Sequence, residues 1–270
     1  MSARQADALA ELWPDFGVTV VDGDRTPLDL GGLFGRVAPR VLEIGFGMGD
    51  ATAAMAAADR GRDYLAVEVH TPGIGNLLAL VRELGLTNVR VAHGDAMELA
   101  HRIPEASLDA IHVFFPDPWP KARHHKRRLI QPRNVGLLRR LLRVGGVLHC
   151  ATDWPEYADA MIATLDGDAG LTRDTPRDAN ASRDTNAGRD TNAGRDTNAG
   201  RDTNAGRDTN AGRDTNAGRD QDAGPEQDTG PDRDAGRDEH GTASGRPETK
   251  FERRGVLAGR PIADLLYRRV

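Results

Sequence analysis

The stretch that decides the fold is residues 40–58, RVLEIGFGMGDATAAMAAA. Residues 40–44 predict a buried strand, because the run is mainly apolar and precedes a turn. Three glycines at alternate positions, Gly45, Gly47 and Gly49, predict that turn. The nearly continuous alanine of residues 51–58 is typical of a helix pressed against a sheet. Strand, glycine turn and helix together open a nucleotide-binding βαβ unit.

Strands and helices alternate outward from this unit. Further strands are predicted at residues 64–69, 89–92, 111–115, 147–151 and 262–268. Helices are predicted at residues 2–13, where Pro14 is expected to stop the helix, and at 73–84, 96–101, 129–143 and 155–165, with a loop or arm at 15–40. The alternation predicts an α/β fold, a Rossmann-like, doubly wound, mostly parallel sheet with one ligand crevice at the carboxyl ends of its strands.

One long segment lacks the residue types that build a core. Between Thr172 and Pro247 there is no Val, Ile, Leu, Met, Phe, Trp, Tyr or Cys, and RDTNAG repeats six times in residues 183–218. Because nothing apolar offsets the ordering entropy, we expect a disordered insertion and not a hexapeptide β-helix. The predicted organisation is a helix and arm at 1–40, one α/β domain at 41–171 and 246–270, and the insertion at 172–245.

Composition bounds the setting. The chain has 270 residues, a formal net charge of −5 and one cysteine, Cys150, so no internal disulfide is possible. A single cysteine fits a reducing compartment. No apolar run reaches the length of a membrane span and no signal peptide precedes the first helix, so we expect a cytoplasmic protein without a membrane partner.

A second stretch, residues 109–128, DAIHVFFPDPWPKARHHKRR, carries the candidate chemistry. Three prolines in five residues stiffen a loop that presents Asp117 just past the carboxyl end of a strand. Residues 121–143 then hold nine Lys or Arg, two His and no Asp or Glu. A carboxylate beside an uncancelled cationic strip favours chemistry on a polyanion. A helix cap is the alternative role for Asp117, and a solvated helix face is the alternative for the strip.

Acidic side chains stand at three successive strands. Glu43 lies inside the first strand, Glu68 ends the second and Asp95 follows the third. G-x-G-x-G occurs in dehydrogenases, flavoproteins and methyltransferases alike, but dinucleotide binding favours G-x-G-x-x-G. The spacing here, with Glu43 before it, matches methyltransferases that use S-adenosylmethionine. Glu68 can accept ribose hydroxyl groups and Asp95 the adenine amino group, although each acid alone could be a helix cap or a solvated turn.

Two adjacent histidines, His124 and His125, raise the question of a metal site. Adjacent residues do not easily share one metal geometry, and no cysteine or third histidine is near in the sequence. We therefore expect no metal.

These motifs resemble the bacterial tRNA (guanine-N7)-methyltransferases. The resemblance rests on LEIGFGMGD, AVEVH, GDAMEL, FPDPWPK followed by H-x-K-R-R, ATDWxxYA and TKFERRG, and it covers the chain apart from the repeat, which precedes TKFE. It implies a Rossmann-like methyltransferase fold, S-adenosylmethionine as donor, tRNA as partner and N7 of a guanine in the tRNA variable loop as target.

The resemblance also implies roles for individual residues. Asp117 is the implied catalytic residue, and the implied cofactor-binding residues are Glu43, Gly45, Gly47, Gly49, Glu68, Asp95 and Asp117. The implied substrate-binding residues are Lys121, Asp153, Thr249, Lys250, Phe251 and Glu252, and the implied RNA-contacting residues are Arg123, His124, His125, Lys126, Arg127 and Arg128.

Three other functions stay open on the residues alone. An adenine amino-methyltransferase would carry D-P-P-[YFW], whereas Trp119 follows Pro118 here. A dehydrogenase would need the longer glycine spacing, and a noncatalytic RNA-binding domain would not need the acids at the other strand ends. The sequence does not decide between a monomer and a homodimer.

Overall fold

The computed structural model describes residues 1–174, 247 and 249–270, apart from the side chains of Lys250, Phe251 and Arg254. The RDTNAG repeat, with the insertion expected around it, lies outside the described residues from 175 onward.

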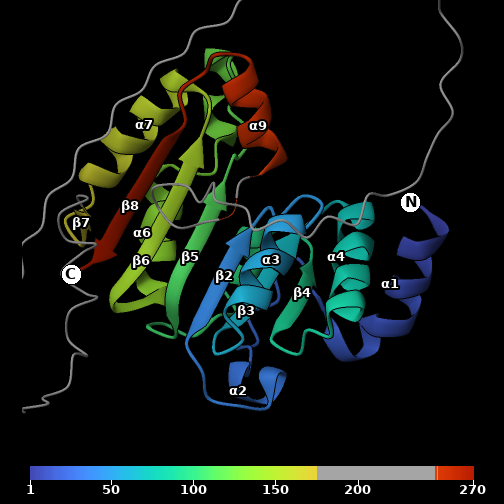
Figure 1. The fold of residues 1–270 in the computed structure, drawn as a ribbon. Coiled ribbons are helices and arrows are strands. Elements are labelled where there is room, and N and C mark those ends of the chain that lie inside the picture. Colours follow the sequence, from blue (N-terminus) through green and yellow to red (C-terminus); the bar gives the residue numbers. More distant parts are fainter. Residues whose placement is uncertain (175–246, 248) are drawn as a thin grey trace, which may run out of the picture. The chain divides into compact units, whose positions relative to one another are not determined.

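The described strands form one eight-stranded sheet in the order β1-β4-β3-β2-β5-β6-β8-β7. They are β1 Gly17–Thr19, β2 Arg40–Ile44, β3 Asp63–Glu68, β4 Val89–His93, β5 Leu108–Phe114, β6 Leu142–Thr152, β7 Leu171–Arg173 and β8 Ala263–Arg269. Strands β1 to β6 pair in parallel, whereas β8 runs antiparallel to β6 and β7 (Figure 1). The predicted doubly wound, mostly parallel sheet is confirmed.

The order in which the chain adds strands to the sheet reverses between β2 and β5. The chain steps outward from β2 through β3 to β4, and it then returns to place β5 on the other side of β2. In open α/β sheets a ligand binds at such a switch point, outside the carboxyl ends of the strands. The glycine turn follows β2 and the PDPWP loop follows β5, so both candidate motifs lie at this point.

Helices cover both faces of the sheet (Figure 1). The described helices are α1 Ala3–Phe16, α2 Leu30–Phe34, α3 Asp50–Ala58, α4 Thr71–Leu84, α5 Ala96–Ala100, the 3-10 helix η1 Ala122–Arg127, α6 Pro132–Leu141, α7 Pro155–Asp166 and α9 Lys250–Leu257. One buried cluster joins α1, α3 and α4 to the sheet, and a second joins α2, α5, α6 and α7 to it.

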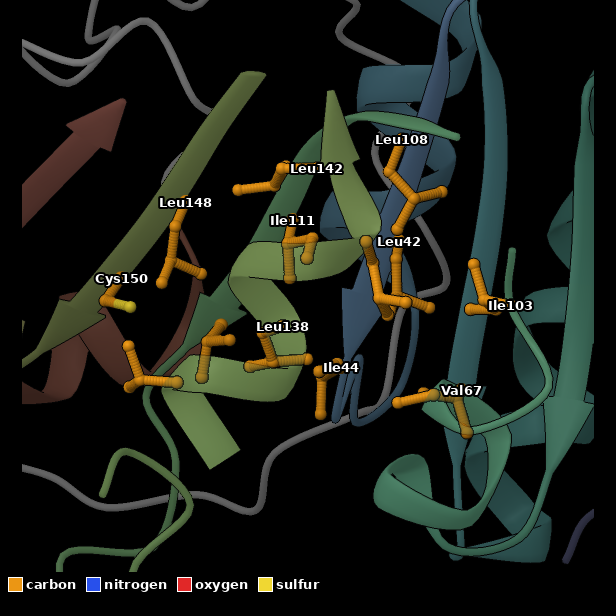
Figure 2. Packing of buried hydrophobic residues seen from close by; sticks show 14 of the residues in the cluster. Leu42, Ile44, Val67, Ile103, Leu108, Ile111, Leu138, Leu142, Leu148 and Cys150 are labelled. Carbon is orange, nitrogen blue, oxygen red and sulfur yellow. The ribbon is translucent and has the colours of Figure 1, made fainter. Parts of the chain in front are cut away.

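The second cluster backs the strands that carry the candidate site. Leu138 of α6 lies in this cluster with Leu42, Ile111 and Leu148 of three neighbouring strands, all fully buried (Figure 2). Burying each such side chain contributes about 1.5 to 3 kcal/mol. The strand ends that hold the turn and the loop are therefore fixed by a close-packed core.

Pro14 does not stop the first helix, contrary to the prediction. Helix α1 continues through Pro14 to Phe16, and the Gly17 amide donates to the Trp13 carbonyl at the end. Proline has a helical φ, although it lacks an amide donor and its ring crowds the carbonyl four residues earlier. Because only two residues of the helix follow Pro14, this cost falls on its last turn and the helix still forms.

Residues 15–40 are not simply a loop, so this prediction is wrong. They contain β1, which pairs with β4 at the sheet edge, and α2, whose Leu30 and Phe34 are buried. A strand of three residues held by backbone pairing is too short to show a hydrophobic period.

Two further boundaries differ from the prediction. The helix expected at 129–143 begins at Pro132, and Leu142 already starts β6, which has a register shift opposite β5. Proline favours the first helical position and forces an extended residue before it. Strand β7 extends beyond Leu171, because Thr172 and Arg173 pair with β8.

Candidate active site

A pocket of about 590 Å³ lies where the glycine turn, the end of β5 and α9 meet. Of the predicted site residues, it is lined by Glu43, Gly45, Gly47, Gly49 and Thr249. His70, Phe114, Phe115 and Arg253 also line it and were missed as site residues. Nothing in the period or spacing of these four residues distinguishes them from core or surface positions.

The glycine turn depends on left-handed backbone at all three glycines. The φ angles are +74° at Gly45, +61° at Gly47 and +80° at Gly49, a region that L side chains rarely adopt. A β-carbon on Gly73 of α4 would lie 1.9 Å from the Gly47 carbonyl oxygen. The turn is thus pressed directly against the start of α4.

Glu43 is a buried carboxyl at the floor of the pocket. The residue is 3% exposed, and its Oε2 atom has no hydrogen-bond partner among the described residues. Burial raises the pKa of the Glu43 carboxyl to about 7, while the nearby Thr52 hydroxyl acts in the opposite direction. The protein therefore holds an acceptor there that a ligand can complete.

Glu68 supports the turn from the end of β3. Its carboxylate accepts from the Gly47 amide at 2.9 Å, and from the amides of Val69 at 2.7 Å and His70 at 3.0 Å. A carboxylate has about four acceptor positions, so one remains for a ligand hydroxyl.

Asp95 does act as a helix cap. One oxygen, Oδ1, accepts from the amides of Met97 and Glu98 at the start of α5. The residue is exposed, and no described residue donates to its Oδ2 atom. Capping and ligand binding thus use different oxygens of the same carboxylate.

Asp117 stands exposed on the loop after β5 and does not cap a helix. No hydrogen bond joins its side chain to the rest of the described chain, and the residue before η1 is Lys121. The loop around it is strained, because Phe115 and Trp119 have φ angles of +52° and +41°. Its carboxylate is therefore exposed and takes no part in the hydrogen bonds of the described residues.

Helix α9 brings the TKFE block to the pocket. Glu252 is buried, and its amide donates to the Thr249 hydroxyl at 3.1 Å while the Thr249 amide donates to the Glu252 carboxylate at 3.4 Å. This reciprocal pair is a capping box. The predicted side chains of Lys250 and Phe251 lie outside the described residues. On the adjacent loop, Asp153 forms an ion pair of 3.0 Å with Arg260.

Acidic side chains neutralise part of the cationic strip, so the prediction that its whole charge is uncancelled is wrong. Acidic residues from elsewhere in the chain pair with its later members: Arg139 with Asp168, Arg140 with Glu105 and Arg143 with Asp109. These partners could not be predicted, because they lie far from the strip in the sequence or outside the range over which charges were counted. Within the described residues, no acidic side chain pairs with four exposed cations of η1 and its N-cap, which are Lys121, Arg123, Lys126 and Arg127.

The two histidines and Arg128 differ from those exposed cations. His124 lies edge-on to Trp119, and His125 is 3.4 Å from the Glu156 carboxylate. Arg128 is 5% exposed and is engaged within the chain. Of the six predicted RNA-contacting residues, three are therefore exposed, the two histidines are partly buried and Arg128 is buried.

Among the described residues, no group of three His, Cys, Asp or Glu side chains could hold a metal ion. None of the described helices is long and apolar enough to span a membrane.

Comparisons with known proteins identify the family of the chain. A family model described as "Putative methyltransferase" matches residues 37–200. A tRNA (guanine-N(7)-)-methyltransferase of Halorhodospira halophila is 56% identical over 170 residues, covering 63% of this chain and 73% of that protein. One from Nitrosococcus oceani is 49% identical over 174 residues, covering 64% of this chain and 72% of that protein. The crystal structure of the 16S rRNA methyltransferase KamB matches with a TM-score of 0.41 and 18% identity, covering 63% of this chain and 93% of that chain. By its motifs, its sheet and these relatives, the chain belongs to the family of the tRNA (guanine-N(7)-)-methyltransferases.

Proposed function

We propose that this protein transfers a methyl group from S-adenosylmethionine to N7 of a guanine in the variable loop of tRNA. The proposal rests on one edge of the sheet, where neighbouring strands are followed by a glycine-turn pocket and by an exposed carboxylate on a stiff loop. Cations that have no acidic partner among the described residues lie next to this loop. The relatives at about half identity support the same activity.

The residues of the pocket fit S-adenosylmethionine. The Oε2 atom of Glu43, to which no described residue donates a hydrogen bond, suits a cationic ligand. The space beside Gly45, where a β-carbon would meet nothing within 4 Å, leaves room for it. Glu68 retains acceptor capacity for ribose hydroxyls, and Oδ2 of Asp95 can accept from the adenine amino group. When bound, S-adenosylmethionine supplies the electrophilic methyl group.

The remaining chemistry requires alignment more than a strong base. Guanine N7 has an in-plane lone pair, so no proton has to be removed before transfer. The methylated base is cationic, and the Asp117 carboxylate can stabilise that developing charge. Asp153, whose Oδ1 atom is not used in its ion pair, can accept from the donor edge of the guanine. Thr249, at the pocket, completes the substrate side.

The cations around η1 provide the contact with RNA. Lys121, Arg123, Lys126 and Arg127 are exposed next to the loop that presents Asp117, so phosphates bound there would bring a tRNA loop to the carboxylate. A tRNA substrate also implies activity in the cytoplasm.

Nucleoside mass spectrometry tests the proposal. Incubation of the protein with S-adenosylmethionine and tRNA is expected to yield 7-methylguanosine, and a tRNA whose variable-loop guanine is replaced by adenine is expected to yield none. N6-methyladenosine would show an adenine amino-methyltransferase instead, and no methylated nucleoside would show a noncatalytic domain.

A further inference from the structure

We propose that Arg128 is a positioning residue that fixes the loop carrying Asp117, and that it does not contact RNA, although it ends the basic segment. The inference rests on the proposed function, since it assigns Arg128 a part in methyl transfer.

Arg128 is enclosed by three contacts inside the chain. Its Nε atom donates to the Pro118 carbonyl at 2.8 Å, and its Nη2 atom donates to the Glu156 carboxylate at 3.1 Å. The guanidinium lies over the ring of Tyr157, 4.8 Å from its centroid. With 5% of its surface exposed, Arg128 has almost no area left for a phosphate.

The neighbouring Arg127 shows the contrast. It is exposed, pairs with no acidic side chain among the described residues and lies over the Trp119 ring at 4.9 Å. These adjacent arginines of one motif therefore differ in their surroundings: Arg127 is exposed to solvent, whereas Arg128 is buried in the protein.

The loop needs an external anchor for a chemical reason. Pro116, Pro118 and Pro120 have no amide hydrogen, so they cannot donate the hydrogen bonds that would close a turn. At the start of the loop, the Phe115 amide donates a hydrogen bond of 2.7 Å to the Ala151 carbonyl. Arg128 then holds the Pro118 carbonyl, which belongs to the residue directly after Asp117.

The anchor leads to a rigid part of the fold. Tyr157 of α7 is fully buried, and its hydroxyl accepts from the Ile130 amide at 3.1 Å. Glu156 precedes it on the same helix, and the hydrogen bond from Arg128 lowers the pKa of the Glu156 carboxyl. The Asp117 loop is thus tied through Arg128 to α7, whose buried face packs on the sheet.

Only an arginine can make this set of contacts. A planar guanidinium offers separate donors to a carbonyl and a carboxylate while stacking on a ring, whereas a lysine offers one flexible ammonium. The substitution Arg128→Lys therefore keeps the charge and removes the geometry. If Arg128 served to attract phosphate, this variant would remain active.

The decisive experiment compares Arg128→Lys with Arg127→Ala in the full chain. Single-turnover methyl transfer is measured at saturating tRNA and S-adenosylmethionine, and tRNA affinity is measured against salt concentration. For Arg128→Lys we expect the rate to fall about tenfold or more, because small displacements of a reacting group are costly, with tRNA affinity and its salt slope unchanged. For Arg127→Ala we expect tRNA affinity to fall and its salt slope to be reduced by about 0.7 to 0.9 for each phosphate that the variant no longer neutralises.

A readout independent of activity accompanies this comparison. With Trp13 and Trp154 replaced by Phe, the remaining Trp119 reports the loop, and its fluorescence should be quenched more readily by acrylamide in Arg128→Lys. Glu156→Gln is a milder second variant, because Arg128 keeps its hydrogen bond to the Pro118 carbonyl. We expect this variant to lose less of the methyl-transfer rate than Arg128→Lys does.

A wild-type rate for Arg128→Lys, or a lowered salt slope in that variant, would overturn the positioning role. An unchanged Trp119 quenching profile would do the same. Formation of 7-methylguanosine by the wild-type protein would leave the proposed function standing in each case.

Discussion

Arg260 lies with its Nη1 atom 3.0 Å from Oδ2 of Asp153, and this ion pair joins the loop after α9 to the loop after β6. Gly255 of α9 packs on the same aspartate, because a β-carbon there would come within 2.8 Å of the Asp153 β-carbon. Two segments far apart in the chain therefore meet at one carboxylate. Because Thr249 directly precedes α9, we expect its position at the pocket to depend on this contact.

Replacing Arg260 with Ala is expected to loosen α9 without unfolding the protein. The pair is partly exposed, so its loss should change the free energy of unfolding by about 1 kcal/mol or less. We expect kcat/KM for tRNA to fall on the order of tenfold, because Thr249 and Glu252 would be held less firmly. Arg82→Ala, which breaks an exposed ion pair of 2.8 Å with Glu11, is the control and should leave kcat/KM unchanged. Equal activities of the two variants would show that α9 is positioned by other contacts.

Asp117→Ala is expected to abolish methyl transfer and to leave the fold intact. The side chain is exposed and makes no described hydrogen bond, so its removal should shift the melting temperature very little. Activity should fall below about a tenth of wild type, because the carboxylate stabilises the cationic product. Nucleoside mass spectrometry and thermal denaturation measure the two quantities. Retained activity would remove Asp117 from the mechanism.

The parts of the site that are local in sequence could be predicted, and the parts made by tertiary contacts could not. The glycine turn is readable because β2, the turn and α3 are consecutive. The partner of Arg139 is Asp168, and the partner of Arg128 is Glu156, 28 residues along the chain. A charge count over the basic strip contains no information about such partners. Strand β1 could not be predicted for a related reason, since its pairing with β4 is made by the backbone and leaves no side-chain pattern in the sequence.

Glu43 should make stability depend on pH in a defined direction. Its folded-state pKa, about 7, lies above the unfolded value of 4.5, so between these values the folded state binds a proton that the unfolded state has lost. This contribution is fully present below pH 4.5 and is lost as pH rises through 7. Urea unfolding of the wild type and Glu43→Gln should therefore diverge by about 2 to 3 kcal/mol between pH 5 and pH 8, with the variant losing less stability. Parallel pH profiles would mean that Glu43 titrates normally.

Two glycine-to-alanine substitutions should act in opposite directions. In Gly73→Ala the new β-carbon would lie 1.9 Å from the Gly47 carbonyl oxygen, and backbone on both sides leaves no flexible group to yield. We expect a loss of about 3 kcal/mol or more in unfolding free energy, together with weakened S-adenosylmethionine binding, because the turn must move. Gly136, inside α6, is the matched control, since a β-carbon there meets nothing within 4 Å. Gly136→Ala should stabilise the protein by up to about 1 kcal/mol through helix propensity and leave cofactor affinity unchanged. Urea denaturation and calorimetric titration with S-adenosylmethionine measure both effects. If Gly73→Ala binds the cofactor as the wild type does, the approach of α4 does not determine the shape of the turn.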